Sequence, residues 1–459
     1  MFVDRDPELE FLRNHLSKAN PEMLVLYGRR RVGKTKLVNQ YLETQDDFSD
    51  QIYYLADERG TEKNVDRFAE EAAKTFDDVK PDAEDFDDVF EYISSRTDSC
   101  LVVIDEFSYL VENDDSVPST FQYVWDEIIE DSISLIILGS SISMIEEGVL
   151  SYESPLYGRR TGQWKITPLR FRHAVEFFPD YDFEDRIRAY ATLGGVPAYL
   201  EKFDPDVSLF DNIERKVLSK GSFLYEEPEF LLRQELREPS TYMSILESMA
   251  LGATTVTKIA NDINRDASSL SRYLKNLREL EMVKKVTPVT ADPGSRGIYV
   301  VSDNFFKFWF RFVYPNLNSL ERGATTDTRK AVESEMDRYV SRIFEEVCRD
   351  VVYEEGFEFE ATNVGRWWYK ENEIDVVAIN EETNEILLGE CKWTTDPVGI
   401  NVLENLRTTS ESVRWKNGSR REKYVLFSRS GFTENVKKVR RGSDDVLLYG
   451  TDEIEEISL

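Results

Sequence analysis

Short, strongly apolar runs alternate with helix-like stretches over the first third of the chain. Five of these runs predict strands, at 23–27, 51–55, 101–104, 134–138 and 164–167. Apolar runs of this length are typical of strands buried on both faces, and helical patterns between them indicate parallel pairing. We therefore predict an α/β fold for residues 1–170, with a parallel sheet covered by helices on both sides.

A glycine-rich loop separates the first strand from the helical stretch that follows it. Residues 28–35 read GRRRVGKT, which fits the pattern GxxxxGKT. Glycines let consecutive backbone N–H groups surround the β- and γ-phosphates of a nucleotide, and the next helix directs its positive end at them. Lys34 would add charge at the transferred phosphoryl group, and the Thr35 hydroxyl would hold Mg²⁺. The predicted ATP-binding residues are Gly28, Arg29, Arg30, Arg31, Val32, Gly33, Lys34 and Thr35.

Polar residues follow two later apolar runs. Asp105 and Glu106 come directly after CLVVI, where Asp105 would hold the shell of Mg²⁺ and Glu106 would polarise the water that attacks the γ-phosphate. The alternative is an ordinary acidic strand end. The run SLIILGSS ends in hydroxyls, and Ser140 is predicted to sense the γ-phosphate.

Arg159 and Arg160 lie in the segment SPLYGRRTGQWKITPL, before the last predicted strand of this domain. A guanidinium in this loop could neutralise transition-state charge as an arginine finger. For either residue, a surface ion pair is the alternative. The sequence does not decide whether such a finger acts within one subunit or between subunits.

The middle of the chain is predicted to be mainly helical. Residues 171–238 contain LGGVPAYL and are interpreted as a helical lid. Residues 239–302 predict three helices and a β-hairpin, the order of a winged helix-turn-helix, and residues 303–335 an aromatic core helix and linker. In a DNA-binding module, the residues of the third helix that face the nucleic acid would be Ser269, Arg272, Tyr273 and Lys275. Packing between domains is the favoured alternative, because nearby acids dilute the positive face.

A different chemistry is predicted for residues 336–459. Asp375 lies near the start of one apolar strand, while Glu390 and Lys392 lie two apart on the next and so share a face. Divalent-metal phosphodiester hydrolysis needs such carboxylates, with Glu345 on the preceding helix as a further ligand, and a lysine that orients the water. The alternative is an ion-paired hairpin, although burying charges among Val, Ile and Leu without a ligand is costly.

A basic segment follows this group, at residues 407–441. It contains eleven Lys and Arg against three Glu, and it is interpreted as a surface for a phosphate backbone. In the opposite reading the protein is a scaffold without nucleic acid, and this segment pairs with the chain's own acidic surface.

The whole chain of 459 residues is acidic, with a formal net charge of −31 and an estimated isoelectric point near 4.6. The acids are spread along the sequence, which indicates adaptation to high salt. Three separated cysteines are typical of reduced thiols, and two histidines leave nothing for a zinc site or a Ser-His triad. Without an apolar run long enough for a membrane span and without a signal peptide, we expect a soluble, cytoplasmic protein.

With these residues identified, the chain resembles archaeal AAA+-like ATPases of the STAND-related branch, which have a winged helix and a C-terminal domain of the PD-(D/E)XK nuclease superfamily. The resemblance rests on GRRRVGKT, VVIDEF, LIILGSS, SPLYGRRT, GGVPAYL, DNFFKFWFRFV, GRWW, EIDVVA and GECKW. It implies ATP and Mg²⁺ as cofactors and a nuclease-like triad of Asp375, Glu390 and Lys392. Ile374 replaces the proline that usually precedes the first carboxylate.

Two readings of function follow. In the first, an ATPase gates a metal-dependent DNA nuclease. In the second, the C-terminal fold is inactive, and the protein is an ATP-switched regulator that binds DNA or a partner. DNA is the expected partner in the first reading, no membrane is involved, and homo-oligomer formation stays open.

Overall fold

The computed structural model describes residues 2–17, 20–45, 47–129, 132–292, 294–354 and 356–458. It divides into two compact units, Met1–Pro168 and Leu169–Leu459, and each is described by itself.

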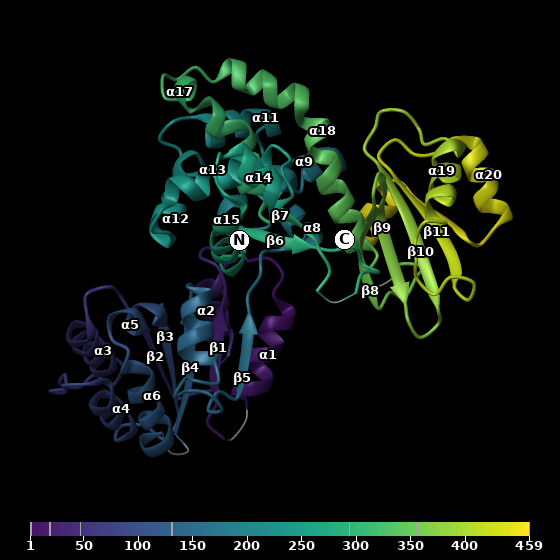
Figure 1. Ribbon diagram of the computed structural model, residues 1–459. Helices are drawn as coiled ribbons and strands as arrows, with labels where there is room; N and C mark the ends of the chain where they lie inside the picture. The colour runs from purple at the N-terminus through teal and green to yellow at the C-terminus, as the bar shows by residue number, and fades with distance from the viewer. Residues whose placement is uncertain are drawn as a thin grey trace. The chain divides into compact units, whose positions relative to one another are not determined.

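The first unit is built around five parallel strands in the order β2-β3-β4-β1-β5 (Figure 1). The strands are β1 (Met23–Tyr27), β2 (Asp50–Leu55), β3 (Cys100–Asp105), β4 (Ile133–Gly139) and β5 (Gly162–Lys165). The helices between them are α1 (Asp6–Leu16), α2 (Lys34–Thr44), α3 (Thr61–Thr75), α4 (Phe86–Ser94), α5 (Phe107–Asn113), α6 (Val117–Tyr123) and α7 (Ile142–Ile145), with π-helical turns at Val124–Ile128 and Glu146–Leu150. The predicted parallel sheet is confirmed, although its last strand begins two residues earlier than expected.

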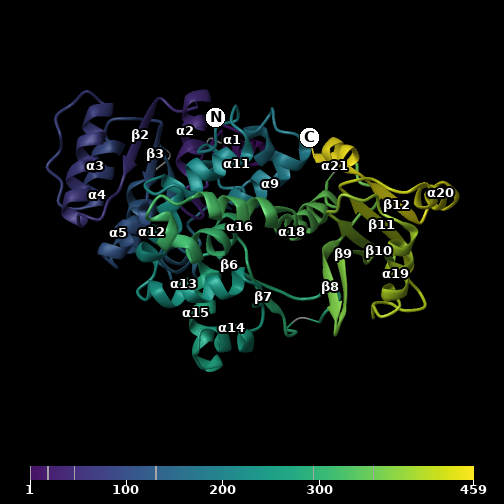
Figure 2. The ribbon, with the colours of Figure 1, turned by 90° about the horizontal axis from the view of Figure 1, so that it is seen from above.

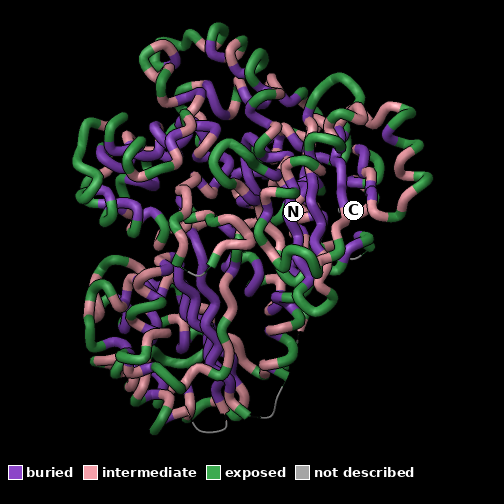
Figure 3. Tube along the Cα trace, turned by 45° about the vertical axis from the view of Figure 1, so that its right-hand side comes forward, coloured by how far each residue is buried: buried purple, intermediate pink, exposed green. Residues whose placement is uncertain are grey.

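Helices cover both faces of this sheet because its strands are apolar on both sides. One core contains Val102 and Ile104 of β3, packed against aromatic side chains of α3 to α6 such as Phe68 and Phe121. The opposite core contains Leu101 and Val103 of the same strand, packed with α1 and α2. Figure 3 shows the strands as the buried centre of the unit. The sheet therefore holds its loops on a rigid base.

The second unit begins with a helical part. Its helices are α8 (Phe171–Ala174), α9 (Phe183–Leu193), α10 (Pro197–Leu200), α11 (Leu209–Asn212), α12 (Phe223–Glu235), α13 (Pro239–Ala250), α14 (Val256–Asp262), α15 (Ala267–Glu279), α16 (Asn304–Phe308), α17 (Leu317–Leu320) and α18 (Thr326–Val351). Shorter helical turns lie at Val175–Phe177, Ile213–Leu218, Trp309–Val313 and Tyr314–Asn316. Strands β6 (Val283–Val286) and β7 (Ile298–Val301) form an antiparallel pair directly after α15.

The aromatic stretch before α17 is part of the core. Phe305, Phe306, Phe308 and Trp309 are fully buried. The indole N–H of Trp309 donates to the Tyr225 carbonyl at 2.9 Å. This burial is what a core or interdomain helix, the interpretation drawn from the sequence, requires.

The second unit ends in a mixed sheet of order β12-β11-β10-β9-β8. Its strands are β8 (Asn363–Tyr369), β9 (Asn372–Asn380), β10 (Glu385–Lys392), β11 (Arg421–Ser428) and β12 (Val446–Tyr449), and its helices are α19 (Ile400–Ser410), α20 (Glu434–Gly442) and α21 (Thr451–Ser458). Neighbours β8, β9 and β10 pair antiparallel, whereas β10, β11 and β12 pair parallel. Both α18 and α19 pack against β9 and β10.

The domain boundary predicted between residues 335 and 336 needs correction. It falls inside α18, which is one continuous helix of 26 residues. In Figure 2 this helix runs from the helical part to the C-terminal sheet. The hairpin loop between β6 and β7 also meets this sheet, since the Val289 N–H donates to the Arg366 carbonyl of β8 at 3.0 Å. The parts of the second unit are thus connected by packing as well as by sequence.

Candidate nucleotide-binding site and a second carboxylate site

The glycine-rich loop curls back before α2 because three of its residues adopt a positive φ. These are Gly28 (151°), Arg31 (70°) and Gly33 (99°). A Cβ atom on Gly28 would lie 2.2 Å from the Ile166 carbonyl oxygen, so only glycine fits there. A Cβ on Gly33 would meet no atom within 4 Å, so this glycine is needed for its backbone conformation at the start of α2.

Lys34 lies across this loop. Its buried ammonium donates to the carbonyls of Gly28 at 2.8 Å and Arg29 at 3.0 Å. The lysine is therefore held inside the curl of the loop, where the pattern GxxxxGKT places the charge that meets phosphate oxygens.

Arg5 braces the loop from outside, and sequence reasoning missed it. Its guanidinium donates to the Val32 carbonyl at 3.1 Å and to the Thr167 carbonyl at 2.7 Å, and it pairs with Glu8 at 2.8 Å. Arg5 is buried and adopts φ 80°, which is uncommon outside glycine. Only its place before an N-terminal helix would have pointed to it in the sequence.

The hydroxyl and carboxylate expected to hold Mg²⁺ lie together. Thr35 Oγ1 donates to Asp105 Oδ2 at 2.7 Å, and the Tyr53 hydroxyl of β2 donates to the same carboxylate oxygen. Burial, followed by the Asp105 charge, raises the pKa of Tyr53, so the phenol keeps its proton. Hard oxygen donors of this kind fit Mg²⁺. Tyr53 is a second residue that sequence reasoning missed.

Glu106 and Ser140, from neighbouring strands β3 and β4, meet at the same end of the sheet. Ser140 Oγ donates to Glu106 Oε2. Glu106 adopts a left-handed φ of 56° where β3 passes into α5, and this conformation turns its side chain away from the strand direction. Beyond it, Arg30 of the loop donates to the Tyr109 hydroxyl at 3.0 Å. The carboxylate expected to act on water is thus positioned by the expected sensor.

The two candidate arginine fingers, Arg159 and Arg160, lie at the end of the sheet opposite to the phosphate loop. They precede β5, whose first residue Gly162 pairs with Leu24 at the start of parallel β1, whereas the phosphate loop follows the end of β1. Arg159 forms an ion pair with Asp126 at 2.9 Å, and Arg160 lies over the Tyr157 ring. These contacts and this position fit the surface ion pair that was the alternative for either residue. A role as an arginine finger, within one subunit or between subunits, stays a prediction.

The predicted C-terminal residues gather where β9 begins and β10 ends. Asp375 Oδ2 accepts from the Cys391 backbone N–H at 3.0 Å, and Arg349 of α18 donates to the Asp375 carbonyl at 2.7 Å. The Lys392 ammonium bonds to Glu390 Oε1 at 2.5 Å, so these two side chains share a face as expected.

Burial and mutual repulsion perturb the carboxylates of this group. Burial, then the Asp375 charge, raises the pKa of Glu345 to about 8 and also raises the pKa of Glu390. Burial is also the main cause of the raised pKa of Asp375. For Lys392, burial acts in the opposite direction, but the bond to Glu390 leaves its pKa raised.

These carboxylates supply the oxygen donors that Mg²⁺ prefers, and their shared repulsion is what a cation would relieve. They do not form a closed set of ligands, because no three His, Cys, Asp or Glu side chains of the described residues are grouped tightly enough to hold a metal ion. To bind a cation, Glu390 would have to give up its bond to the Lys392 ammonium.

The basic segment 407–441 is largely neutralised by the protein's own acids. Ion pairs engage Arg407, Arg420, Arg421, Arg429, Lys437, Arg440 and Arg441.

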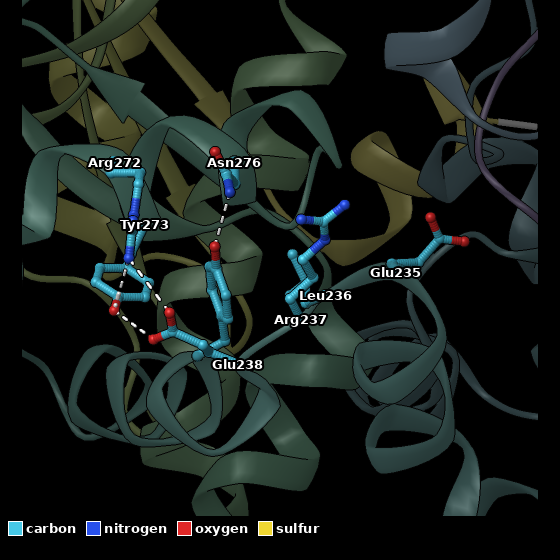
Figure 4. Close-up of a pocket in the computed structure, with 8 residues that line it drawn as sticks. Glu235, Leu236, Arg237, Glu238, Arg272, Tyr273 and Asn276 are labelled. Atoms are coloured by element: carbon cyan, nitrogen blue, oxygen red, sulfur yellow. Dashed lines mark hydrogen bonds and ion pairs between the residues drawn. The ribbon is translucent and has the colours of Figure 1, made fainter. Parts of the chain in front are cut away.

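The third helix of the middle region also differs from expectation. Ser269, Arg272 and Lys275 of α15 are exposed, whereas Tyr273 is buried and donates to Glu238, so Tyr273 cannot face a nucleic acid (Figure 4).

The loop, the acidic strand end and the hydroxyl on a parallel sheet define a P-loop ATPase domain. Residues 2–203 match a family described as an ATPase domain predominantly from Archaea, and residues 309–408 match one described as archaeal and bacterial proteins of unknown function. The chain is 38% identical over 399 residues to the uncharacterized protein MJECL04 of Methanocaldococcus jannaschii, which covers 86% of this chain and 88% of that protein. This chain belongs to the same family.

Two solved structures are similar as well. The Walker-type ATPase paby2304 of Pyrococcus abyssi is 21% identical, covers 67% of this chain and 96% of its own, and has a TM-score of 0.48. The ORC2 protein of Aeropyrum pernix is 13% identical, covers 72% of this chain and 95% of its own, and has a TM-score of 0.47. None of the described helices is long and apolar enough to cross a membrane.

Proposed function

We propose that this protein is a Mg²⁺-dependent ATPase that binds ATP at residues 28–35. The observation that carries the proposal is the Thr35 to Asp105 bond of 2.7 Å, which brings the hydroxyl at the start of α2 to the acidic end of β3. Bound Mg²⁺ would neutralise charge on the β- and γ-phosphates.

In this mechanism four of the chain's own residues have a role. Lys34 releases the loop carbonyls and binds the phosphate oxygens, and Asp105 orients the Thr35 hydroxyl. Glu106 accepts the proton of the attacking water, while Ser140 fixes the carboxylate of Glu106 through its hydroxyl. Each role uses a contact already made at one end of the sheet.

Two variants test the ATPase. Lys34→Ala should abolish binding of a fluorescent ATP analogue and with it phosphate release, whereas Glu106→Gln should bind the analogue and lose turnover by at least 100-fold, on the order expected for a general base. Lys36→Ala is the matched control, because Lys36 is an exposed lysine two residues further along α2. Wild-type hydrolysis by Lys34→Ala would overturn the proposal.

The C-terminal group supports a second function, metal-dependent hydrolysis of a phosphodiester bond in DNA, gated by the nucleotide state. Asp375, Glu390 and Glu345 would have to move closer together to hold Mg²⁺, because they are not grouped as a ligand set in this structure, and Lys392 would then orient the water. The specific observation is that these partly buried carboxylates lie together beside one lysine at the end of the sheet, where their pKa values are raised. The alternative is an ATP-switched regulator that binds DNA or a partner through an inactive fold.

DNA cleavage distinguishes the two readings. With Mg²⁺ or Mn²⁺ at molar salt, the purified protein should cut or nick DNA, and Lys392→Ala should lose cutting while it keeps ATP hydrolysis. Lys438→Ala, an exposed lysine of α20 without an ion pair among the described residues, is the control. Cutting that survives in an Asp375→Ala, Lys392→Ala double variant would exclude this site, and no cutting of any DNA or RNA would favour the regulator.

A further inference from the structure

An open cleft lies on the C-terminal sheet, at the end where Asp375 and Lys392 are found. Its volume is about 540 Å³, and it is lined by the turn between β8 and β9 and by the segment after α19. The lining residues are Tyr369, Lys370, Glu371, Asn372, Glu411, Ser412, Arg414 and Asn417.

The cleft and the carboxylate group share one end of the sheet. Asn372, which lines the cleft, is the first residue of β9 and lies three positions before Asp375, a span of about 10 Å along a strand. Because side chains alternate along a strand, Asn372 and Asp375 lie on opposite faces. The sheet therefore separates the cleft from the carboxylates, and a strand in the cleft would reach Asp375 only by passing around the end of β9.

The cations of the cleft differ from most cations of this domain. Seven of the eleven Lys and Arg in segment 407–441 form ion pairs with the protein's own carboxylates. Among the described residues, neither Lys370 nor Arg414 forms such a pair, although both are exposed. Glu371 and Glu411 line the same opening, so its formal charge is balanced, and an anion would be attracted only where it lies nearer to Lys370 and Arg414 than to these acids.

An aromatic face completes the cleft. The Tyr369 side chain is 53% exposed, and the Lys370 ammonium lies 5.4 Å from its ring centroid. Amide groups of Asn372 and Asn417 lie at the same opening. Cations beside an exposed ring, with amides around them, match a chain of phosphates that carries flat bases. They do not match a simple anion, which needs no ring.

We propose that this cleft binds a single strand of nucleic acid, with a base stacked on Tyr369 and the backbone phosphates between Lys370 and Arg414. The proposal goes beyond the proposed function, because the cleft lies on the opposite face of β9 from Asp375 and can bind a strand whether or not the carboxylates cut it. Glu371 and Glu411, which stand at the same opening, repel the backbone and limit the affinity.

Binding is measured in EDTA with a labelled oligothymidylate of about 20 nucleotides, so that cutting plays no part. Tyr369→Ala and Arg414→Gln should each weaken binding by about tenfold, and Arg414→Gln should also reduce the slope of log affinity against log salt by about 0.7. Glu411→Gln should tighten binding. Loss of a positive charge in Arg414→Gln should weaken binding and loss of a negative charge in Glu411→Gln should strengthen it, as expected when the ligand carries phosphates.

The matched control is Arg441→Gln, which removes an exposed arginine of the same domain that pairs with Glu434. Binding by this variant should stay within about twofold of wild type, because its charge is already compensated. Equal losses in Arg441→Gln and Arg414→Gln, tighter binding of an acidic peptide than of the oligonucleotide, or no effect of Tyr369→Ala would overturn the proposal. If the protein binds the strand but cuts no DNA, the binding proposal for the cleft holds and the proposed nuclease activity is wrong. If the protein cuts DNA and neither Tyr369→Ala nor Arg414→Gln changes the cutting, the nuclease proposal holds and the proposal for the cleft is wrong.

Discussion

Arg429 connects three elements of the second unit, and its removal should cost more stability than that of any exposed arginine. It follows β11 directly, and its guanidinium pairs with Glu184 of α9 and with Asp337 of α18, the latter at 2.9 Å. The same guanidinium lies 5.0 Å from the Trp393 ring centroid. We consider Arg429→Met, which keeps the length of the side chain and removes its charge.

The expected loss of stability depends on how deeply Arg429 is buried and on which ion pairs remain for Glu184 and Asp337. The Arg429 side chain is 11% exposed, and breaking a buried pair costs about 3–5 kcal/mol when the partner charge stays uncompensated. Here both acids are partly exposed, Glu184 at 35% and Asp337 at 49%, and Arg188 still pairs with both. We therefore expect Arg429→Met to lower the free energy of unfolding by about 2–3 kcal/mol.

The assay is urea unfolding of the full chain followed by tryptophan fluorescence, at low salt and at molar salt. Arg441→Met is the control, because this side chain is 70% exposed and its ion pair with Glu434 is 4.0 Å long, so its loss should stay below about 1 kcal/mol. Molar salt should erase the small effect of the control and leave most of the Arg429 effect, because screening acts mainly on exposed charges. Equal losses for both variants, or a loss for Arg429→Met that vanishes in salt, would refute the reasoning.

Two further predictions concern the candidate sites. Tyr53→Phe removes one of the two hydroxyl bonds that orient Asp105, and such a bond to a charged acceptor is worth about 1.5–3 kcal/mol. Mg²⁺-dependent binding of ATP should therefore weaken by about tenfold, while Mg²⁺-free binding stays unchanged. Titration of a fluorescent nucleotide with and without Mg²⁺ checks this, and equal changes in both would contradict it. The raised pKa of Glu345, about 8, means that the metal-free folded state holds a proton the unfolded state has lost, so stability should fall as pH rises from about 4.5 to about 8. Glu345→Gln should flatten this fall in urea unfolding at several pH values, and an unchanged slope would show that another group is responsible.

The sequence predicted those parts of the fold and site that are encoded locally. The order strand, glycine-rich loop, helix around Lys34 is a local pattern, and the structure places it at the end of β1. Glu106 and Ser140 directly follow the neighbouring parallel strands β3 and β4, whose carboxyl ends must meet at one end of the sheet. These predictions needed only the strand assignments.

Two residues show how position in the fold bears on a role suggested by residue type. Arg159 precedes a strand parallel to β1, so topology alone places it at the end away from the phosphate loop. Tyr273 belongs to the buried stripe of α15 together with Leu270, Leu274 and Leu277, whose spacing is that of one helix face. In both cases a residue type favoured a function that its position does not support.

Other features depend on contacts between residues far apart in the sequence, and patterns of neighbouring residues do not predict such contacts. Tyr53 meets Asp105 from a different strand, and Arg5 reaches Thr167 across most of the first unit. The local excess of positive charge in segment 407–441 was misleading for the same reason, since the acids that neutralise Arg429 lie far upstream, at Glu184 and Asp337.

The Arg429 contacts also bear on how nucleotide state could reach the second site. The match to the archaeal ATPase family extends to residue 203 and so includes α9, although α9 lies in the second unit. Glu184 of α9 is paired with Arg429, whose backbone N–H donates at 3.0 Å to the carbonyl of Lys392. Any displacement of α9 must therefore either break this ion pair or move the end of β10 that carries Lys392. If nucleotide binding displaces α9, these contacts would carry the displacement to Lys392, and Arg429→Met should then uncouple the carboxylate site from the nucleotide state.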